Sequence, residues 1–319
     1  MTALPRSRAL SDLQATNPVL FDLAVVTLAI AAGFIGSLIG LGGGALLVPG
    51  LVMFLGVPMK TAVAASLMAV VFTSSAAAMI RGRDAFTNYR VGLLLETVAG
   101  VASVIGAITA FMVSATALQF TFGGVLLAIA ALTMRRMNDE DTSGRPSHPW
   151  SRALRLDGME DTAEGPRIYR VQQVPLGVSI MGIAGVIAGM LGLGAGAVKV
   201  LSMDTCMKIP FRTSTVTSNF MIGATAAAGS VAFLRLGLID PSVAGPVAVG
   251  IVPGAMLGSW LVSRIRLRAL RVVFLAFVAL TGIQMLLKAS GVLSCPIRPK
   301  WIVCARSDSI QPQRRSSGS

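Results

Sequence analysis

Hydrophobic residues of this chain occur in long blocks that contain almost no charge. No Asp, Glu, Lys or Arg occurs in residues 23–59, 61–80 or 213–234, and Glu96 is the only one in residues 91–134. A transmembrane helix needs roughly 20 mainly apolar residues, because the hydrocarbon core of a bilayer is about 30 Å thick. A membrane β-barrel would instead show short segments of alternating polarity. The pattern therefore predicts a polytopic helical membrane protein with the lipid bilayer as its environment.

The lengths of the blocks predict about eight transmembrane helices. Residues 22–56 and 172–206 are each too long for one simple helix, and each contains a glycine cluster. The other expected spans are residues 61–80, 91–113, 117–134, 213–233, 242–263 and 270–288. The expected fold class is all-α.

The chain matches itself when it is shifted by 152 residues. "GFIGSLIGLGGGALLV" at 33–48 then lies over "GVIAGMLGLGAGAVKV" at 185–200, and eleven of the 34 positions from 33 to 66 are identical. A shared apolar bias would not align the glycines, a proline and a basic-Thr pair in one register. We therefore expect two homologous halves, each with a glycine-broken first helix, whose relative direction the sequence leaves open.

The predicted organisation has five segments. They are an N-terminal cytoplasmic segment (1–21), a first transmembrane repeat (22–134), a polar cytoplasmic loop (135–170), a second transmembrane repeat (171–289) and a tail that is flexible at least at its end (290–319). Eight crossings with both ends inside place most Lys and Arg on the inner side, as membrane proteins prefer. Four arginines between 264 and 271 argue against this orientation.

Charge and cysteine usage exclude several classes of protein. The formal net charge is +13, but the basic residues lie in loops and tails with no aromatic-interleaved patch, so we expect no nucleic-acid partner. Three cysteines form no CxxC pair, and His148 lies in the polar loop, so no metal site, disulfide framework or cofactor is expected. Nucleotide-binding and hydrolase motifs are absent from the sequence, so we expect neither an ATP-driven pump nor an enzyme.

The glycine clusters are candidates for an anion site. A break in a membrane helix is tolerated where it is buried in protein or lines a watery cavity, and the helix after the break offers unpaired N–H groups to an anion. The alternative is close helix packing, which the four-residue spacing of Gly36, Gly40 and Gly44 also fits. The glycines assigned to the candidate site are Gly42, Gly43, Gly44, Gly194 and Gly196.

A second repeated element follows each cluster: "VPMKTAVAAS" at 57–66 and "IPFRTSTVTS" at 209–218. Lys60 and Arg212 are candidates to attract an anion, although basic residues at span ends more often reach for lipid headgroups. Neutral side chains are candidates to hydrogen-bond the anion, with contacts between helices as the alternative role. These neutral candidates are Thr61, Thr213, Ser66, Ser218 and Asn219.

Ionisable residues inside apolar blocks are functional candidates by default. Lys199 is assigned to the site, and Asp204 is the ionisable residue nearest to it in the sequence. Glu96 is a candidate to carry a coupling proton, but an interfacial position near Arg90 is the safer expectation.

At these residues the chain resembles the TauE/SafE family of sulfite exporter-like membrane permeases. The resemblance covers most of residues 22–288 and rests on the "GxxGLGGGxxxVP" run, its second copy and the Pro-x-basic-Thr element after each. It implies a multi-pass permease of the bacterial inner membrane that moves small sulfur-containing anions such as sulfite or sulfonates. The second copy differs from the family pattern, with Ala195 in place of a glycine and Leu201 in place of Pro49.

We therefore expect a secondary transporter that exports a small anion by alternating access between the two repeats. An ion or proton gradient is the expected energy source. A non-transport membrane scaffold or assembly protein is the alternative, although such a protein would not need two matched breaks. Homo-oligomerisation is left open as a further partner interaction.

Overall fold

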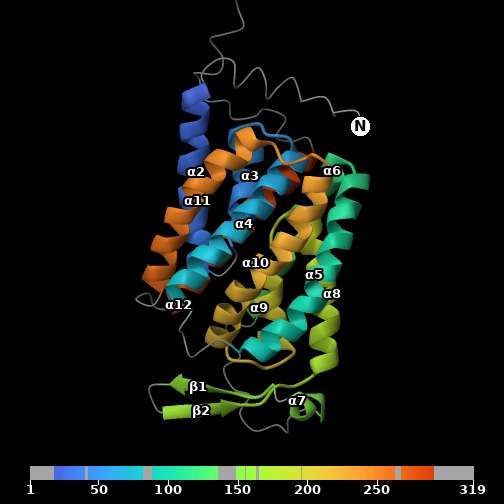
Figure 1. The fold of residues 1–319 in the computed structure, drawn as a ribbon, viewed down its shortest axis with the longest axis vertical. Helices are drawn as coiled ribbons and strands as arrows, with labels where there is room; N and C mark the ends of the chain where they lie inside the picture. Colours follow the sequence, from blue (N-terminus) through green and yellow to red (C-terminus); the bar gives the residue numbers. More distant parts are fainter. Residues whose placement is uncertain are drawn as a thin grey trace, which may run out of the picture.

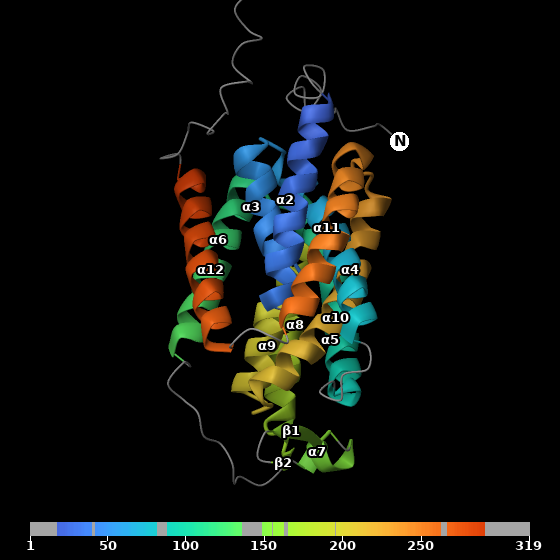
Figure 2. The same cartoon turned by 90° about the vertical axis from the view of Figure 1, so that its left-hand side faces the viewer.

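The structure is a computed structural model that describes residues 18–39, 42–81, 88–135, 149–154, 156–162, 165–194, 196–262 and 267–290. Nearly all of the predicted segments 1–21 and 290–319 therefore lie outside the described residues. The described residues form a bundle of long helices with a small cap at one end (Figures 1 and 2).

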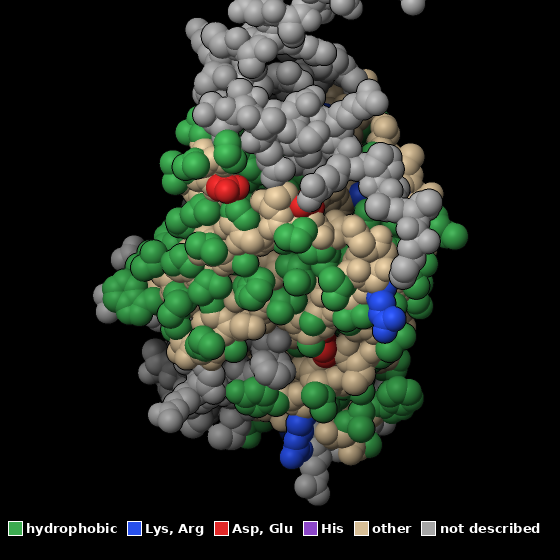
Figure 3. Space-filling view, turned by 45° about the horizontal axis from the view of Figure 1, so that its top comes forward, with side chains coloured by type: hydrophobic (Ala, Val, Ile, Leu, Met, Phe, Trp, Pro, Cys, Tyr) green, Lys and Arg blue, Asp and Glu red, His purple; other side chains and the backbone are tan. Residues whose placement is uncertain are grey.

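The all-α prediction is confirmed for the membrane part of the chain. Six helices are long and apolar enough to cross a membrane among the residues that the structure describes. Hydrophobic side chains cover much of the face shown in Figure 3, and the charged side chains there are few and separated.

The first half contains α2 (Pro18–Ile39), α3 (Gly44–Phe54), α4 (Met59–Arg81), α5 (Tyr89–Met112) and α6 (Ala115–Arg135). The second half contains α8 (Val174–Leu191), α9 (Gly196–Thr205), α10 (Phe211–Arg235), α11 (Pro241–Val262) and α12 (Leu267–Ala289).

The glycine cluster of the first half reverses the chain direction. A Cβ placed on Gly36 would lie 2.1 Å from the backbone nitrogen of Gly43, so the turn folds back onto α2. Further along α3, a Cβ on Gly50 would lie 2.7 Å from the Leu28 side chain. Helix α3 therefore runs antiparallel to α2 and returns to the end at which α2 started.

The second half contains the same kind of re-entrant pair. Ser202 of α9 donates a hydrogen bond of 3.3 Å to the carbonyl of Gly177, which lies in the first turn of α8. A Cβ on Gly177 would also lie 2.7 Å from the side chain of Met207, just after α9. The end of α9 thus lies beside the start of α8.

Re-entrant pairs change the topology that charge counting predicts. Figures 1 and 2 show α2 starting at the top of the bundle and α8 starting at the bottom. The two halves are therefore inverted relative to one another. The start of α2 and the small cap therefore lie at opposite ends of the described bundle, and each glycine-broken block begins and ends at one end of it (Figure 1). The start of α12, in the arginine-rich region 264–271, falls at the same end as the start of α8.

Each broken helix is held by a helix of the other half. Helices α2 and α11 are parallel neighbours, and a Cβ on the glycines of α11 would lie only 2.2–2.5 Å from carbonyl oxygens of α2. The pairs are Gly250 with Val26, Gly254 with Ile30 and Gly258 with Phe34. Helices α5 and α8 pack in the same way, with Gly185 against Ala99 and Gly189 against Ser103. Small residues let these membrane helices approach at backbone distance.

Positions of the helices support the predicted repeat. The starts of α3, α4, α5 and α6 each lie 152 residues before the starts of α9, α10, α11 and α12. The turns that follow α3 and α9 also correspond, since Gly56 and Lys208 both have positive φ, at 65° and 56°. The two equivalent turns are closed by equivalent hydrogen bonds of 3.0 Å, from Val57 to Leu51 and from Ile209 to Met203.

A small cap occupies part of the predicted polar loop. It consists of α7 (Pro149–Ala153) and an antiparallel hairpin of β1 (Gly158–Thr162) and β2 (Gly165–Tyr169), paired from Gly158↔Tyr169 to Thr162↔Gly165. The sequence analysis predicted no structure there. Asn88, just before α5, fastens the cap by donating hydrogen bonds of 2.9 Å to the Leu156 carbonyl and to the Tyr169 hydroxyl.

The close packing of α5 on α8 can be tested by substitution of a glycine at their interface. A Cβ on Gly106 would lie 2.0 Å from the carbonyl oxygen of Val186, whereas a Cβ on Gly124 of α6 would meet nothing within 4 Å. We expect Gly106→Ala to lower the stability of the detergent-solubilised protein by about 1–3 kcal/mol through overpacking. Gly124→Ala is the matched control and is expected to be neutral or slightly stabilising. Thermal unfolding of both variants tests the packing, and equal melting temperatures would contradict it.

Candidate functional site

The two glycine breaks meet at the interface between the halves. Gly42 and Gly194 are equivalent positions of the repeat, and both are buried with positive φ, at 70° and 65°. Val70 and Ile222 cover both breaks, because a Cβ on either glycine would lie within 3.0 Å of each of these side chains. Val70 lies midway along α4, and Ile222 lies near the middle of α10. The breaks are therefore placed about halfway through the bundle.

Backbone groups of one break lie against the other. A Cβ on Gly44, the first residue of α3, would lie 2.4 Å from the carbonyl oxygen of Gly192, where α8 ends. The first N–H groups of an α-helix and its last carbonyls have no partner within the helix. Helix starts and helix ends from both halves thus meet in one buried region.

The predicted serines bind backbone carbonyls of the second break. Ser66 of α4 donates a hydrogen bond of 2.8 Å to the Gly192 carbonyl, which belongs to the other half. Ser218 of α10 donates one of 3.1 Å to the carbonyl of Gly196. Both side chains are fully buried. In this conformation they make the contacts between helices that the sequence analysis named as their alternative role.

Two other predicted residues carry unused hydrogen-bonding atoms. The Oγ1 atom of Thr213 and the Nδ2 atom of Asn219 are buried and have no hydrogen-bond partner among the described residues. Asn219 is next to Ser218 on α10, and its backbone carbonyl accepts a hydrogen bond of 2.8 Å from Ser74 of α4. A buried polar atom without a partner is expensive, so such atoms often mark a place where a ligand or water binds.

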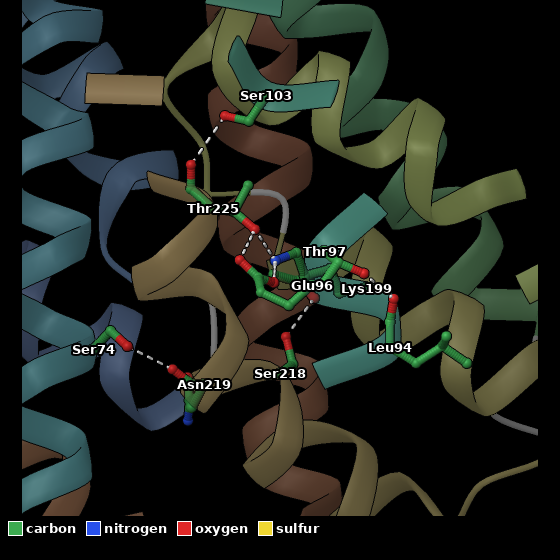
Figure 4. Close-up of polar contacts among 10 residues, drawn as sticks. Ser74, Leu94, Glu96, Thr97, Ser103, Lys199, Ser218, Asn219 and Thr225 are labelled. Atoms are coloured by element: carbon green, nitrogen blue, oxygen red, sulfur yellow. Dashed lines mark hydrogen bonds and ion pairs between the residues drawn. The ribbon is translucent and has the colours of Figure 1, made fainter. Parts of the chain in front are cut away.

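A buried ion pair lies beside the second break (Figure 4). Lys199, in the first turn of α9, donates a hydrogen bond of 2.7 Å to the Glu96 carboxylate of α5. Lys199 also donates to the Thr225 hydroxyl of α10, which in turn donates to Glu96. Ser103 of α5 donates a hydrogen bond of 3.0 Å to the Thr225 carbonyl. Four polar residues thus join α5, α9 and α10 in an otherwise apolar region.

This pairing was not predicted from the sequence. Asp204 is the ionisable residue nearest to Lys199 along the chain, but the salt bridge joins Lys199 to Glu96. Thr225 and Ser103 were not predicted at all. One signal could have found the pair: buried charges need partners, and Glu96 and Lys199 have opposite signs in adjacent apolar blocks.

Predicted residues at the starts of α4 and α10 belong to helix positions away from the breaks. The Lys60 ammonium donates a hydrogen bond of 2.8 Å to the Phe111 carbonyl and lies 5.3 Å from the centre of the Phe111 ring. Lys60 and Thr61 begin α4, about 15 Å along the helix from Val70. Arg212 is at the start of α10, and its side chain lies outside the described residues.

Chemically, the region combines groups that suit an anion with groups that suit a cation. The starts of α3 and α9 direct the positive ends of their helix dipoles toward the breaks, and the ends of α2 and α8 direct negative ends there. Glycines allow close approach to the backbone, and Asn219 adds a neutral donor. Lys199 supplies the cationic charge, balanced by Glu96.

Two inverted bundles with broken helices meeting between them define a membrane protein built like many secondary transporters. Comparison with known proteins agrees with this class. The model of the family "Sulfite exporter TauE/SafE" matches residues 25–285, and the chain belongs to that family.

Named relatives support a membrane transporter. The chain is 27% identical over 241 residues to "Probable membrane transporter protein YunE" of Bacillus subtilis (strain 168), which covers 73% of this chain and 84% of the relative. It is 24% identical over 241 residues to "Probable membrane transporter protein YdhB" of the same organism, covering 76% and 89%. No solved structure matches the chain significantly.

The hydrogen bond from Ser66 to Gly192 joins the two halves, and its removal is expected to weaken the fold. Ser66→Ala leaves the buried carbonyl without this donor and should lower stability by about 1 kcal/mol. Ser75→Ala on the same helix is the control, because Ser75 is exposed and bonds only the Val71 carbonyl of its own helix. Unfolding in detergent measures both variants, and an equal loss of stability would show that the contact between halves contributes nothing.

Proposed function

We propose that this protein is a secondary transporter that moves a small sulfur-containing anion, such as sulfite or a sulfonate, across the bacterial inner membrane. The observation that carries the proposal is that two glycine interruptions, one from each inverted half, meet midway along α4 and α10. A membrane helix loses stability at such a break. Two breaks that meet at one point between the halves therefore suggest a site rather than two separate packing devices.

An oxyanion suits the groups around the breaks. It carries several acceptor oxygens and no donor, so it can accept hydrogen bonds from backbone N–H groups and from Asn219, whose Nδ2 atom has no partner among the described residues. Lys199 compensates its charge in a region shielded from water. A cation would instead find few carboxylates here, since Glu96 is already paired with Lys199.

Inverted halves also suggest how the site changes sides. The same movement made by either of two units that the inverted repeat relates opens opposite ends of the bundle. Because α2 packs on α11 and α8 packs on α5, each unit combines helices of both halves. The tightly packed pairs α2–α11 and α5–α8 are natural rigid bodies for this movement, because each consists of helices in backbone contact. Val70 and Ile222 lie over both breaks, so in this proposal these two side chains move apart when the anion enters.

Anion binding is tested by thermal unfolding of the purified protein with sulfite, thiosulfate, sulfate, sulfoacetate or carboxylates, at constant ionic strength with chloride. A ligand that binds the folded state raises the melting temperature, and a concentration 100 times Kd contributes about 2.7 kcal/mol. We expect stabilisation by at least one sulfur-containing anion. A response to none of them would favour the scaffold or assembly role.

The breaks themselves are tested by substitution. Gly43→Leu and Gly194→Leu place side chains at positive φ, at 76° and 65°, within the breaks. We expect both variants to insert into membranes but to lose anion flux in reconstituted vesicles. Gly124→Leu, at an exposed and open position of α6, should retain flux. Retained flux in the first two variants would rule out the breaks as the transport site.

A further inference from the structure

We propose that Glu96 and Lys199 form a proton-coupling site. In this proposal the transported anion replaces the Glu96 carboxylate as the partner of Lys199, and Glu96 takes up a proton from water. Each anion then moves together with a proton. The inference rests on the function proposed above and extends it to the ion that moves with the anion, so that an inward proton gradient drives uptake and not the export expected from the sequence.

The fold of a half does not require this ion pair, because the equivalent positions of the repeat are apolar. The repeat places Leu47 at the position of Lys199 and Ala248 at the position of Glu96. Leu47 is fully buried, so an apolar side chain fills the equivalent space. Thr73, at the position of Thr225, donates to the Ala69 carbonyl of its own helix. A buried ion pair is seldom the most stable filling of a core, so its presence in one half indicates a role other than packing.

The geometry allows Lys199 to exchange partners. Lys199 follows Gly196 by three residues and so belongs to the second break, next to the proposed anion site. Its ammonium has three hydrogens, and the contacts to Glu96 and Thr225 use two of them. Thr225 contacts both charged groups and can remain bonded to either when the pair separates.

Glu96 is the more exposed member of the pair. The Glu96 side chain is 13% exposed, whereas Lys199 is fully buried. Glu96 also lies only about 10 Å along α5 from Tyr89, at the capped end of the bundle. In this proposal the proton reaches the Glu96 carboxylate from the capped end.

Charge balance makes the proton necessary. The pair is neutral as it stands, and an entering monovalent anion would leave the buried region with a net negative charge, which a low-dielectric site tolerates poorly. One proton moving from water to a Glu96 carboxylate oxygen restores neutrality while Lys199 pairs with the anion. When the anion leaves, Glu96 releases the proton and the salt bridge forms again. No other bond is made or broken.

Other ionisable residues on the neighbouring elements do not take this role. Helix α8 contains none, and those of α10 stand at its two ends, while the remaining ones lie at the start of α5 and near the end of α9. They are Arg212 and Arg235 on α10, Tyr89 and Arg90 on α5, and Asp204 and Cys206 in and after α9. Glu96 is the carboxylate that contacts Lys199.

Glu96→Gln is the decisive variant, because glutamine keeps the size and hydrogen bonding of glutamate but cannot exchange a proton. For the wild-type protein in weakly buffered solution, we expect sulfite or another stabilising anion to cause proton uptake, read with a pH-sensitive dye. In vesicles, we expect a proton gradient to drive accumulation of that anion. In Glu96→Gln, binding and flux down the anion gradient should persist, whereas proton uptake and proton-driven accumulation should be lost. Asp22→Asn, at an exposed acid in the first turns of α2, should behave as wild type.

A double variant separates function from folding. E96A/K199L introduces the residue types that the first half carries at these positions, so it should fold and melt close to wild type while losing stabilisation by anions. K199L alone leaves Glu96 buried without its partner and should be clearly less stable.

If the wild-type protein binds no anion, the proposed function itself fails. If it binds anions without proton uptake, or if Glu96→Gln keeps proton-driven accumulation, the coupling proposal is overturned and the transport proposal stands.

Discussion

An interruption in a membrane helix leaves backbone N–H and C=O groups unpaired, and these groups must be buried against protein. In this fold the two interruptions pack against one another. Gly44 lies against the Gly192 carbonyl, and Ser66 donates to the same oxygen from the opposite half. Lipid offers no hydrogen bonds, so neither break would be tolerated alone at this depth. The close pairing of the halves and the covering side chains Val70 and Ile222 follow from this requirement.

Much of the fold could be predicted from the sequence, because its signals are local or periodic. Long uncharged blocks identify the helices, and the glycine clusters mark where the first block of each half breaks. The direction of the chain after a break could not be predicted, since a kinked helix and a re-entrant pair have the same apolar length. Block lengths therefore predicted about eight crossings, whereas six helices among the described residues are long and apolar enough to cross a membrane. The paired strands of the cap carry no apolar alternation, which is why the polar loop gave no sign of them.

The candidate site was predicted in part for similar reasons. The glycines, Ser66 and Ser218 were found because they belong to a repeated motif, and the structure brings them together. Glu96 and Lys199 are 103 residues apart, so a search for partners along one helix could not join them. The repeat contains a signal that could have found them. Lys199 and Glu96 are charged, whereas the equivalent positions of the other half are apolar, and such differences mark positions where the two halves differ in role.

The first helix of each half packs on a helix of the other half, and this arrangement has a consequence for synthesis of the protein. Helix α2 packs along its length on α11, and the contact between Ser37 and Ser259 joins residues 222 positions apart. During synthesis α2 enters the membrane long before its partner exists. Its small-residue face must meanwhile be sheltered by lipid, by other early helices or by the insertion machinery. Neither half can complete its own core, so the nascent chain reaches its final packing late, and a product truncated before α11 would expose a ready-made surface for unwanted association.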